Sequence, residues 1–267
     1  MTQQNQQPLW APSPERAAAS GMAAFMRHAG FDDYEALWQW SVDRPEAFWP
    51  MVWDHCGAVG ERGGRVLEHG DRMPGAVWFS EARLNYAENL LKHRDHADAL
   101  VFWGEDKVRR KLSREALYAE VSRFQQALKA AGVGKGDRVA GYLPNMPETI
   151  VAMLAATALG AIWTSASPDF GVQGVLDRFG QIAPKVLVCV DGYWYNGKPV
   201  DCLAKNAEAV AQLPSVEKTV VVGYLSETPD VSAIRNGVRF ADFVAPHAAG
   251  AVDFVRLPFD HPLFIMY

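Results

Sequence analysis

The sequence has few cysteines, no excess of positive charge and no long hydrophobic run. Three cysteines in 267 residues do not make a disulfide framework, so we expect a reducing, cytoplasmic location. A formal net charge of -5 excludes a general nucleic-acid scaffold, which needs a concentrated basic surface. No apolar run reaches the roughly 18–20 residues of a membrane-spanning helix, and the polar start MTQQNQQPLW is unlike a signal peptide.

Sequence signatures of catalysis are also missing. The chain contains no Gly-x-Ser-x-Gly, Cys-x-x-Cys or His-Glu-x-x-His motif. The glycine-rich run 132–137 follows a predicted helix and precedes a predicted strand, the reverse of a phosphate-binding loop, so we interpret it as a turn. His55 beside Cys56, and His93 with His96, lack the second ligand pair of a zinc site. The residues alone therefore predict no metal site and no complete catalytic constellation.

Residues 1–75 are predicted to form a helical, tryptophan-rich segment. Apolar residues recur at helical spacing from Met22 onward, and Gly30 supplies a helix stop. Pro50 lies in a later helical pattern and predicts either a kink or a late helix start. Six of the nine tryptophans lie at or before Trp78. Their helical spacing favours a helix-docking surface over stacking on a base or a cofactor ring.

Residues 76–267 are predicted to form part of an α/β domain. After a helix at Arg83–His93 and a hairpin within 99–112, apolar strands alternate with helices of about a dozen residues. The predicted strands cover residues 138–143, 161–165, 185–190 and 218–222, with a further buried strand at Phe264–Met266. The fold class is therefore α/β, a helical N-terminal segment followed by a βαβ parallel-sheet domain. Because the apolar run LFIMY ends abruptly, we expect this domain to be truncated at its C-terminus.

Three loops follow predicted strands at their carboxyl ends, where open α/β sheets bind ligands. The first, Pro144–Glu148, is either a rigid turn with Pro147 at the first helical position or a ligand contact. The second, Ser165–Gly171, either caps the next helix or holds a polar ligand. The third, Asp191–Pro199, is either an exposed hairpin or, through its aromatic residues and Lys198, a site for a nucleotide-like group.

The stretch from Val77 to Tyr267 carries the motifs of a known family. They are VWF at 77–79, LNYAENL at 84–90, KGDRV at 135–139, LPNMPE at 143–148, MLA at 153–155 and LGAIW at 159–163. On these residues the chain resembles the N-terminal domain of adenylate-forming acyl-CoA synthetases. Its PLWAPSPE opening, SASPDFG loop and DGYWYNGK segment are more similar to the acetoacetate-activating subfamily than to the acetate-activating one. The latter typically has an FGGFSP-like loop and an Arg-bearing segment at the last two places.

The resemblance implies a two-step ligase reaction. A carboxylate, here that of acetoacetate, attacks the α-phosphate of ATP with the help of Mg²⁺ to give an acyl-adenylate, and the thiol of CoA then displaces AMP. The family's phosphate loop, adenine motifs, Mg²⁺ ligand and catalytic lysine would lie beyond Tyr267. The resemblance therefore assigns no catalytic and no metal residue here, and the 267 residues alone are expected to be inactive, with no cofactor assigned to them with certainty.

The resemblance does imply part of a CoA site. The loop Ser167–Gly171 corresponds to a segment near the CoA nucleotide, which points to Asp169, Phe170 and Gly171. Lys198 stands where the family has a phosphate-contacting Arg, and its point charge gives a looser contact than a guanidinium fork. The expected partners are acetoacetate, ATP and CoA, with no nucleic acid and no membrane. Two alternatives stay open: a non-catalytic CoA- or nucleotide-binding or interaction module, and a fragment of an acetyl- or propionyl-CoA synthetase.

Overall fold

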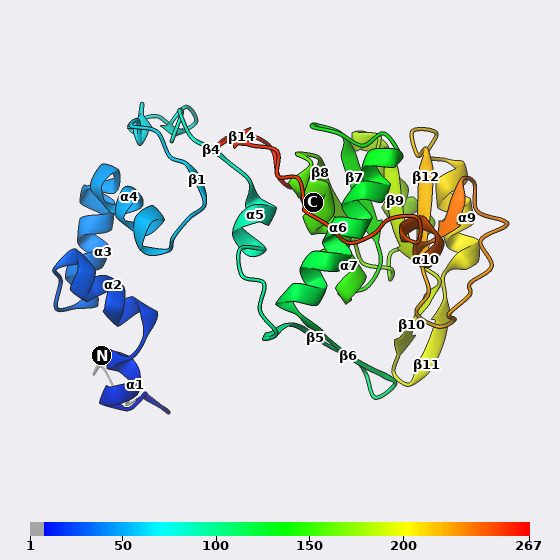
Figure 1. Cartoon of the computed structure of the whole chain (residues 1–267), viewed down its shortest axis with the longest axis horizontal. Helices are drawn as coiled ribbons and strands as arrows, with labels where there is room; N and C mark the ends of the chain where they lie inside the picture. The colour runs from blue at the N-terminus through cyan, green and yellow to red at the C-terminus, as the bar shows by residue number, and fades with distance from the viewer. Residues whose placement is uncertain (1–7) are drawn as a thin grey trace, which may run out of the picture. The chain divides into compact units, whose positions relative to one another are not determined.

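The computed structural model describes residues 8–267, which group into two compact units (Figure 1). The first unit holds the described residues up to Ala58 together with Gly63–Ser80. The second unit holds Val59–Arg62 together with Glu81–Tyr267. A division into domains between residues 75 and 76 stays a prediction.

Short capped helices make up most of the first unit. They are α1 (Pro14–Ala18), α2 (Gly21–Ala29), α3 (Tyr34–Asp43) and α4 (Pro45–His55), followed by an antiparallel pair of β2 (Leu67–Glu68) and β3 (Val77–Trp78). The side chains of Ser13, Ser20 and Asp33 each accept a backbone N–H at the start of a helix. Gly30 ends α2 in the left-handed conformation (φ 79°), which confirms the predicted stop.

Aromatic rings hold the first unit together. The Trp40 and Phe48 rings lie 5.6 Å apart between centroids, and so do those of Trp53 and Phe79. These contacts support the helix-docking interpretation of the tryptophan-rich segment. The predicted late start at Pro50 is wrong, because α4 begins at Pro45, where a missing N–H breaks no helical hydrogen bond.

The second unit is organised around a parallel sheet in the order β13-β12-β9-β7-β8 (Figure 1). Its strands are β7 (Arg138–Tyr142), β8 (Ile162–Ala166), β9 (Val186–Val190), β12 (Lys218–Val222) and β13 (Gly237–Arg239). Every neighbouring pair is parallel, which confirms the predicted fold class. The most central strand, β9, is apolar throughout because both of its faces are covered.

Helices cover both faces of the sheet. On one face lie α6 (Arg114–Ala130) and α7 (Pro147–Ala158), and on the other lie α8 (Val172–Ile182) and α9 (Leu203–Ala211). The alternation along β9 shows the two layers, since Val188 packs in the α6–α7 core and its neighbours Leu187 and Cys189 pack in the α8–α9 core. The chain therefore winds to both sides of the sheet.

Two hairpins extend from this unit. The predicted hairpin within 99–112 is confirmed as β5 (Asp98–Gly104) paired antiparallel with β6 (Val108–Ser113). A second hairpin joins β10 (Gly192–Tyr195) to β11 (Lys198–Asp201). A short helix, α10 (Phe240–Val244), follows β13. In the part of the chain that the structure describes, no helix has the length and apolarity needed to cross a membrane.

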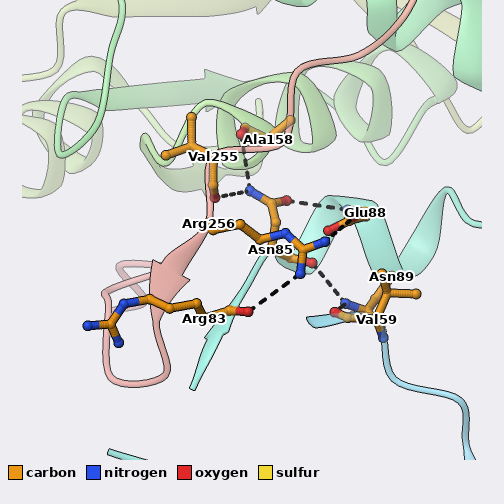
Figure 2. Close-up of polar contacts among 8 residues, drawn as sticks. All are labelled: Val59, Arg83, Asn85, Glu88, Asn89, Ala158, Val255 and Arg256. Carbon is orange, nitrogen blue, oxygen red and sulfur yellow. Dashed lines mark hydrogen bonds and ion pairs between the residues drawn. The ribbon is translucent and has the colours of Figure 1, made fainter. Parts of the chain in front are cut away.

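The buried side chain of Asn85 ties distant segments together (Figure 2). Its Nδ2 donates to the carbonyls of Thr157, Ala158 and Val255 at 2.9–3.2 Å, and its Oδ1 accepts the N–H of Glu88 at the start of α5 (Tyr86–Leu90). The predicted helix Arg83–His93 is therefore wrong at both ends. Asn85 caps the helix, and the residues before it form β4 (Arg83–Leu84), which pairs with β1 (Gly60–Glu61) and β14 (Leu257–Pro258).

The neighbours of Asn85 extend the same network. Asn89 exchanges two hydrogen bonds with the backbone of Val59, at 2.7 and 2.9 Å. Glu88 forms an ion pair with Arg256 at 2.9 Å. These contacts hold the strand β1 and the segment around residue 256 against α5 (Figure 2).

The segment 263–265 runs beside β8 at the edge of the sheet. Trp163 donates to the carbonyl of Leu263 at 3.0 Å, and Ile265 donates to the carbonyl of Trp163 at 2.9 Å. This is one parallel bridge, so the predicted buried strand at Phe264–Met266 is not formed among the described residues. Met266 lies outside this bridge and is 86% exposed.

Candidate functional site

The candidate site lies at the carboxyl ends of the central strands. The loop after β7 leads to α7 on one face, whereas the loops after β8 and β9 lead to α8 and α9 on the other. Since β7 lies between β8 and β9, this is the topological switch point of the sheet. Loops diverge there and leave a crevice beyond the strand ends. The sequence-predicted loops 144–148, 165–171 and 191–199 all meet at this edge.

A pocket of about 360 Å³ opens between the loops after β7 and β8. It is lined by Leu143, Pro144, Asn145, Thr149, Ser165, Ala166, Ser167 and Pro168. Pro147 occupies the first position of α7, and Thr149 Oγ1 donates to the Pro144 carbonyl at 2.6 Å. The rigid-turn interpretation of Pro144–Glu148 is therefore confirmed, and this rigid turn forms one wall of the pocket.

The loop Ser167–Gly171 is fixed from three different elements. From β7, the Tyr142 hydroxyl donates to the carbonyl of Phe170. From α9, the Lys205 ammonium donates to the carbonyl of Pro168. From β10, the Tyr193 hydroxyl donates to Asp169 Oδ1 at 2.5 Å. Hydrogen bonds from β7, α9 and β10 thus converge on this one loop.

The carboxylate of Asp169 joins this loop to the β10–β11 hairpin. The hydrogen bond from Tyr193, a second one from Ser167 Oγ at 2.8 Å and the charge of Lys205 lower the pKa of Asp169 below its usual value. Burial and the bond to Asp169 raise the pKa of Tyr193, so its hydroxyl keeps the proton that it donates. Burial likewise raises the pKa of Tyr142 to about 12. At neutral pH the hydroxyls of Tyr142 and Tyr193 are therefore protonated donors, and the carboxylate of Asp169 is an ionised acceptor.

The predicted residues Phe170 and Gly171 lead into α8. Phe170 is 39% exposed, and the guanidinium of Arg178 lies over its ring at 4.2 Å. Gly171 is the residue before α8, with φ −69° and no side-chain cap, and it needs no glycine-specific conformation. The loop Ser165–Gly171 supplies the N-cap of α8 through Gly171, whose carbonyl accepts the N–H of Val175, but no loop side chain caps the helix. Asp169 accepts from Tyr193 and Ser167 instead.

The segment Asp191–Pro199 is confirmed as a hairpin. Lys198 lies directly opposite Tyr195, and Tyr193 lies two residues before Tyr195, so these three side chains share one face of the hairpin. Within residues 8–267, no ion pair or hydrogen bond engages the Lys198 ammonium. The structure therefore brings Asp169 and Tyr193 into contact, and places Lys198 on the same hairpin face farther toward the tip.

Sequence reasoning missed two residues of this site. Tyr142 is the last residue of β7, and its tyrosine hydroxyl at a buried strand end is a signal that a polar partner lies nearby. Lys205 lies in the first turn of α9, where a cation opposes the helix dipole. The buried Asp191, in contrast, is structural, since its carboxylate accepts the amides of residues 224–226 at 2.7–3.2 Å.

Known proteins match this chain over nearly all of its length. Residues 87–267 match the model of the AMP-binding enzyme family, and residues 34–90 match that of the acetyl-coenzyme A synthetase N-terminus. The acetoacetyl-coenzyme A synthetase of Rhizobium meliloti (strain 1021) is 51% identical over 99% of the chain, and that of Macaca fascicularis is 41% identical over 98%. The solved acetoacetyl-CoA synthetase from Streptomyces lividans has a TM-score of 0.88 and 38% identity over 98% of the chain. The chain spans 41% of the length of each of these three proteins.

Proposed function

Because the chain belongs to the AMP-binding enzyme family, we propose that it supplies the N-terminal part of an ATP-dependent acetoacetate–CoA ligase. Three similar proteins named acetoacetyl-CoA synthetase, at 38–51% identity, support acetoacetate over acetate or propionate as the acid. The sparse cysteines support a cytoplasmic location for it.

The proposed reaction of the whole protein has two steps. The acetoacetate carboxylate attacks the α-phosphate of ATP and releases pyrophosphate, and the thiol of CoA then attacks the acyl carbonyl and releases AMP. Bound Mg²⁺ would offset the charge of the phosphates. Among residues 8–267 no group of three or more His, Cys, Asp or Glu side chains is placed to hold a metal ion. We therefore propose no Mg²⁺ ligand among these residues.

The proposed role of this chain's own residues is to bind the nucleotide part of CoA. The observation that carries this is the fixation of the loop Ser167–Gly171 from three elements at the switch point. A loop that is already ordered loses little entropy when a ligand binds. Phe170 offers a partly exposed aromatic side chain for a base, and Lys198 offers an exposed, unpaired cation for a phosphate. Asp169 holds the loop, and Gly171 keeps the start of α8 open beside it.

Titration calorimetry of the 267-residue chain with CoA tests this role. We expect wild-type binding that weakens as salt is added, and about fivefold weaker binding in Lys198→Ala. Lys111→Ala is the matched control, because Lys111 is also an exposed hairpin lysine but pairs with Asp98. Absence of CoA binding, or equal effects of the two substitutions, would overturn the assignment of Lys198.

A ligase assay tests whether the 267 residues are inactive alone and which acid the longer protein activates. The chain supplied with acetoacetate, ATP and CoA is expected to form no AMP, whereas a protein extended to the length of its relatives is expected to prefer acetoacetate over acetate and propionate. Robust AMP formation by these 267 residues would show that they contain the catalytic groups after all. A preference for acetate in the longer protein would overturn the proposed substrate.

A further inference from the structure

A carboxylate from one hairpin holds the tip of the other. The backbone N–H of Asn196 donates to Glu105 Oε1 at 2.6 Å, and that of Gly197 donates to Glu105 Oε2 at 2.7 Å. Glu105 belongs to the turn between β5 and β6, whereas Asn196 and Gly197 form the turn between β10 and β11. The tips of these two hairpins lie side by side in the second unit (Figure 1).

The geometry of the turn explains why it needs this carboxylate. Asn196 and Gly197 both have positive φ, 50° and 74°, as in a two-residue hairpin turn of the I′ type. The ladder there pairs Tyr195 with Lys198, so the two turn amides have no partner within their own hairpin. An ionised carboxylate that accepts both amides makes two charge-assisted hydrogen bonds. Glu105 therefore fixes the tip rather than only touching it.

The same hairpin is also fixed at its base. Asp191, directly before β10, accepts the amides of residues 224–226. The turn that carries Glu105 rests on Tyr224 of that segment, so closely that a Cβ on Gly104 would lie 1.9 Å from the Tyr224 hydroxyl. Both anchors of the β10–β11 hairpin thus rest on one segment, which makes the hairpin a rigid platform.

We propose that Glu105 is a positioning residue for CoA, which acts through Lys198; this rests on the proposed CoA role of Lys198. Lys198 is the first residue after the clamped turn, so the two bonds to Glu105 fix its backbone. The flexible side chain of Lys198 is then attached to a fixed backbone, which restricts the positions that its ammonium can reach. Glu105 is itself an anion near the proposed phosphate. Simple charge repulsion would make its removal strengthen CoA binding, whereas positioning makes its removal weaken it.

The test measures CoA affinity by calorimetry and amide hydrogen exchange of residues 194–200 without CoA. Glu105→Ala is expected to raise the Kd about threefold and to speed exchange at the turn about tenfold. Glu105→Gln is expected to fall between, because its one amide oxygen accepts one of the two N–H groups. Asp106→Ala is the matched control, since Asp106 is a neighbouring exposed acid whose ion pair, among residues 8–267, is with Lys107. It is expected to leave both readouts unchanged.

A double variant separates positioning through Lys198 from a general effect on the fold. If Glu105 acts through Lys198, Glu105→Ala causes no further loss of affinity in a Lys198→Ala background. Wild-type or tighter CoA binding by Glu105→Ala, or losses that add in the double variant, would overturn the proposal while Lys198 keeps its role. An unchanged Kd in Lys198→Ala alone has a different meaning, since it overturns the CoA role of Lys198 and this proposal together.

Discussion

Replacing Asn85 by alanine is expected to destabilise the second unit by about 3 kcal/mol. The side chain is only 1% exposed. The Val255 carbonyl loses its side-chain donor, at a cost of about 1–2 kcal/mol. The carbonyls of Thr157 and Ala158 keep backbone donors, so their loss together is about 1 kcal/mol. Loss of the cap on the Glu88 amide adds about 1 kcal/mol, and shared partners reduce the sum.

Asn85→Asp sharpens the same prediction. Aspartate has the same shape and keeps an oxygen for the cap, but it replaces the donating Nδ2 with an acceptor that faces three carbonyls. We therefore expect it to be less stable than Asn85→Ala at pH 7. Because the carbonyls raise the pKa of this new carboxyl above its unfolded value, the penalty decreases as the pH falls and the carboxyl regains a proton to donate.

Urea unfolding followed by circular dichroism measures both effects. If the free energy of unfolding has the same slope against urea concentration in all variants, differences in the unfolding midpoint report differences in stability. Asn145→Ala is the control, since Asn145 is exposed, and it is expected to change stability by less than about 0.5 kcal/mol. A loss below about 0.5 kcal/mol in Asn85→Ala, or greater stability of the aspartate than of the alanine variant at pH 7, would refute the reasoning.

Three shorter predictions concern the loop and the cysteines. The hydrogen bond from Tyr193 lowers the pKa of Asp169 below 3.8, so NMR titration should show a smaller shift in Tyr193→Phe. The stability that this lowered pKa contributes to the fold is present above the unfolded-state pKa and is lost as the pH falls through the lower folded-state pKa. Tyr142→Phe should cost about 1 kcal/mol and speed amide exchange in residues 167–171, and unchanged exchange would contradict the clamp. Burial raises the pKa of the Cys189 thiol, so a thiol reagent should label exposed Cys56 quickly and Cys189 only upon unfolding; equal rates in the folded protein would count against this.

The sheet was predictable because its signals are local. Val186–Val190 is apolar at every position, which is typical of a parallel strand covered on both faces, and it is buried throughout. The extent of the helix near Arg83–His93 was not predictable in the same way. Its apolar spacing is helical, but the start is set by Asn85, whose side chain binds carbonyls 72–170 residues away. No local pattern reports such a contact.

The location of the candidate site was predictable from the sequence, but the hydrogen bonds that hold its loop were not. The rule that ligands bind at strand ends located the loops that meet at the switch point. It did not show how the loop at Asp169 is held, because a short polar residue before a helix is usually a cap. Here the Tyr193 hydroxyl, 24 residues away in the sequence, donates a hydrogen bond to the Asp169 carboxylate instead. The choice between two hydrogen-bond partners depends on the tertiary structure.

Two residues at this edge break local rules, and both prove to be clamps. Lys205 puts a cation in the first turn of α9, where the helix dipole disfavours it, and it donates to the carbonyl of Pro168 while lying 5.4 Å from the Tyr142 ring. Glu105 has a left-handed backbone (φ 51°), which is uncommon for a non-glycine residue, and it holds the turn before Lys198. Natural sequences keep such local conflicts where a long-range contact compensates for them. Both compensating contacts here fix segments proposed to face CoA, so the conflicts themselves are evidence that the positions of these segments matter.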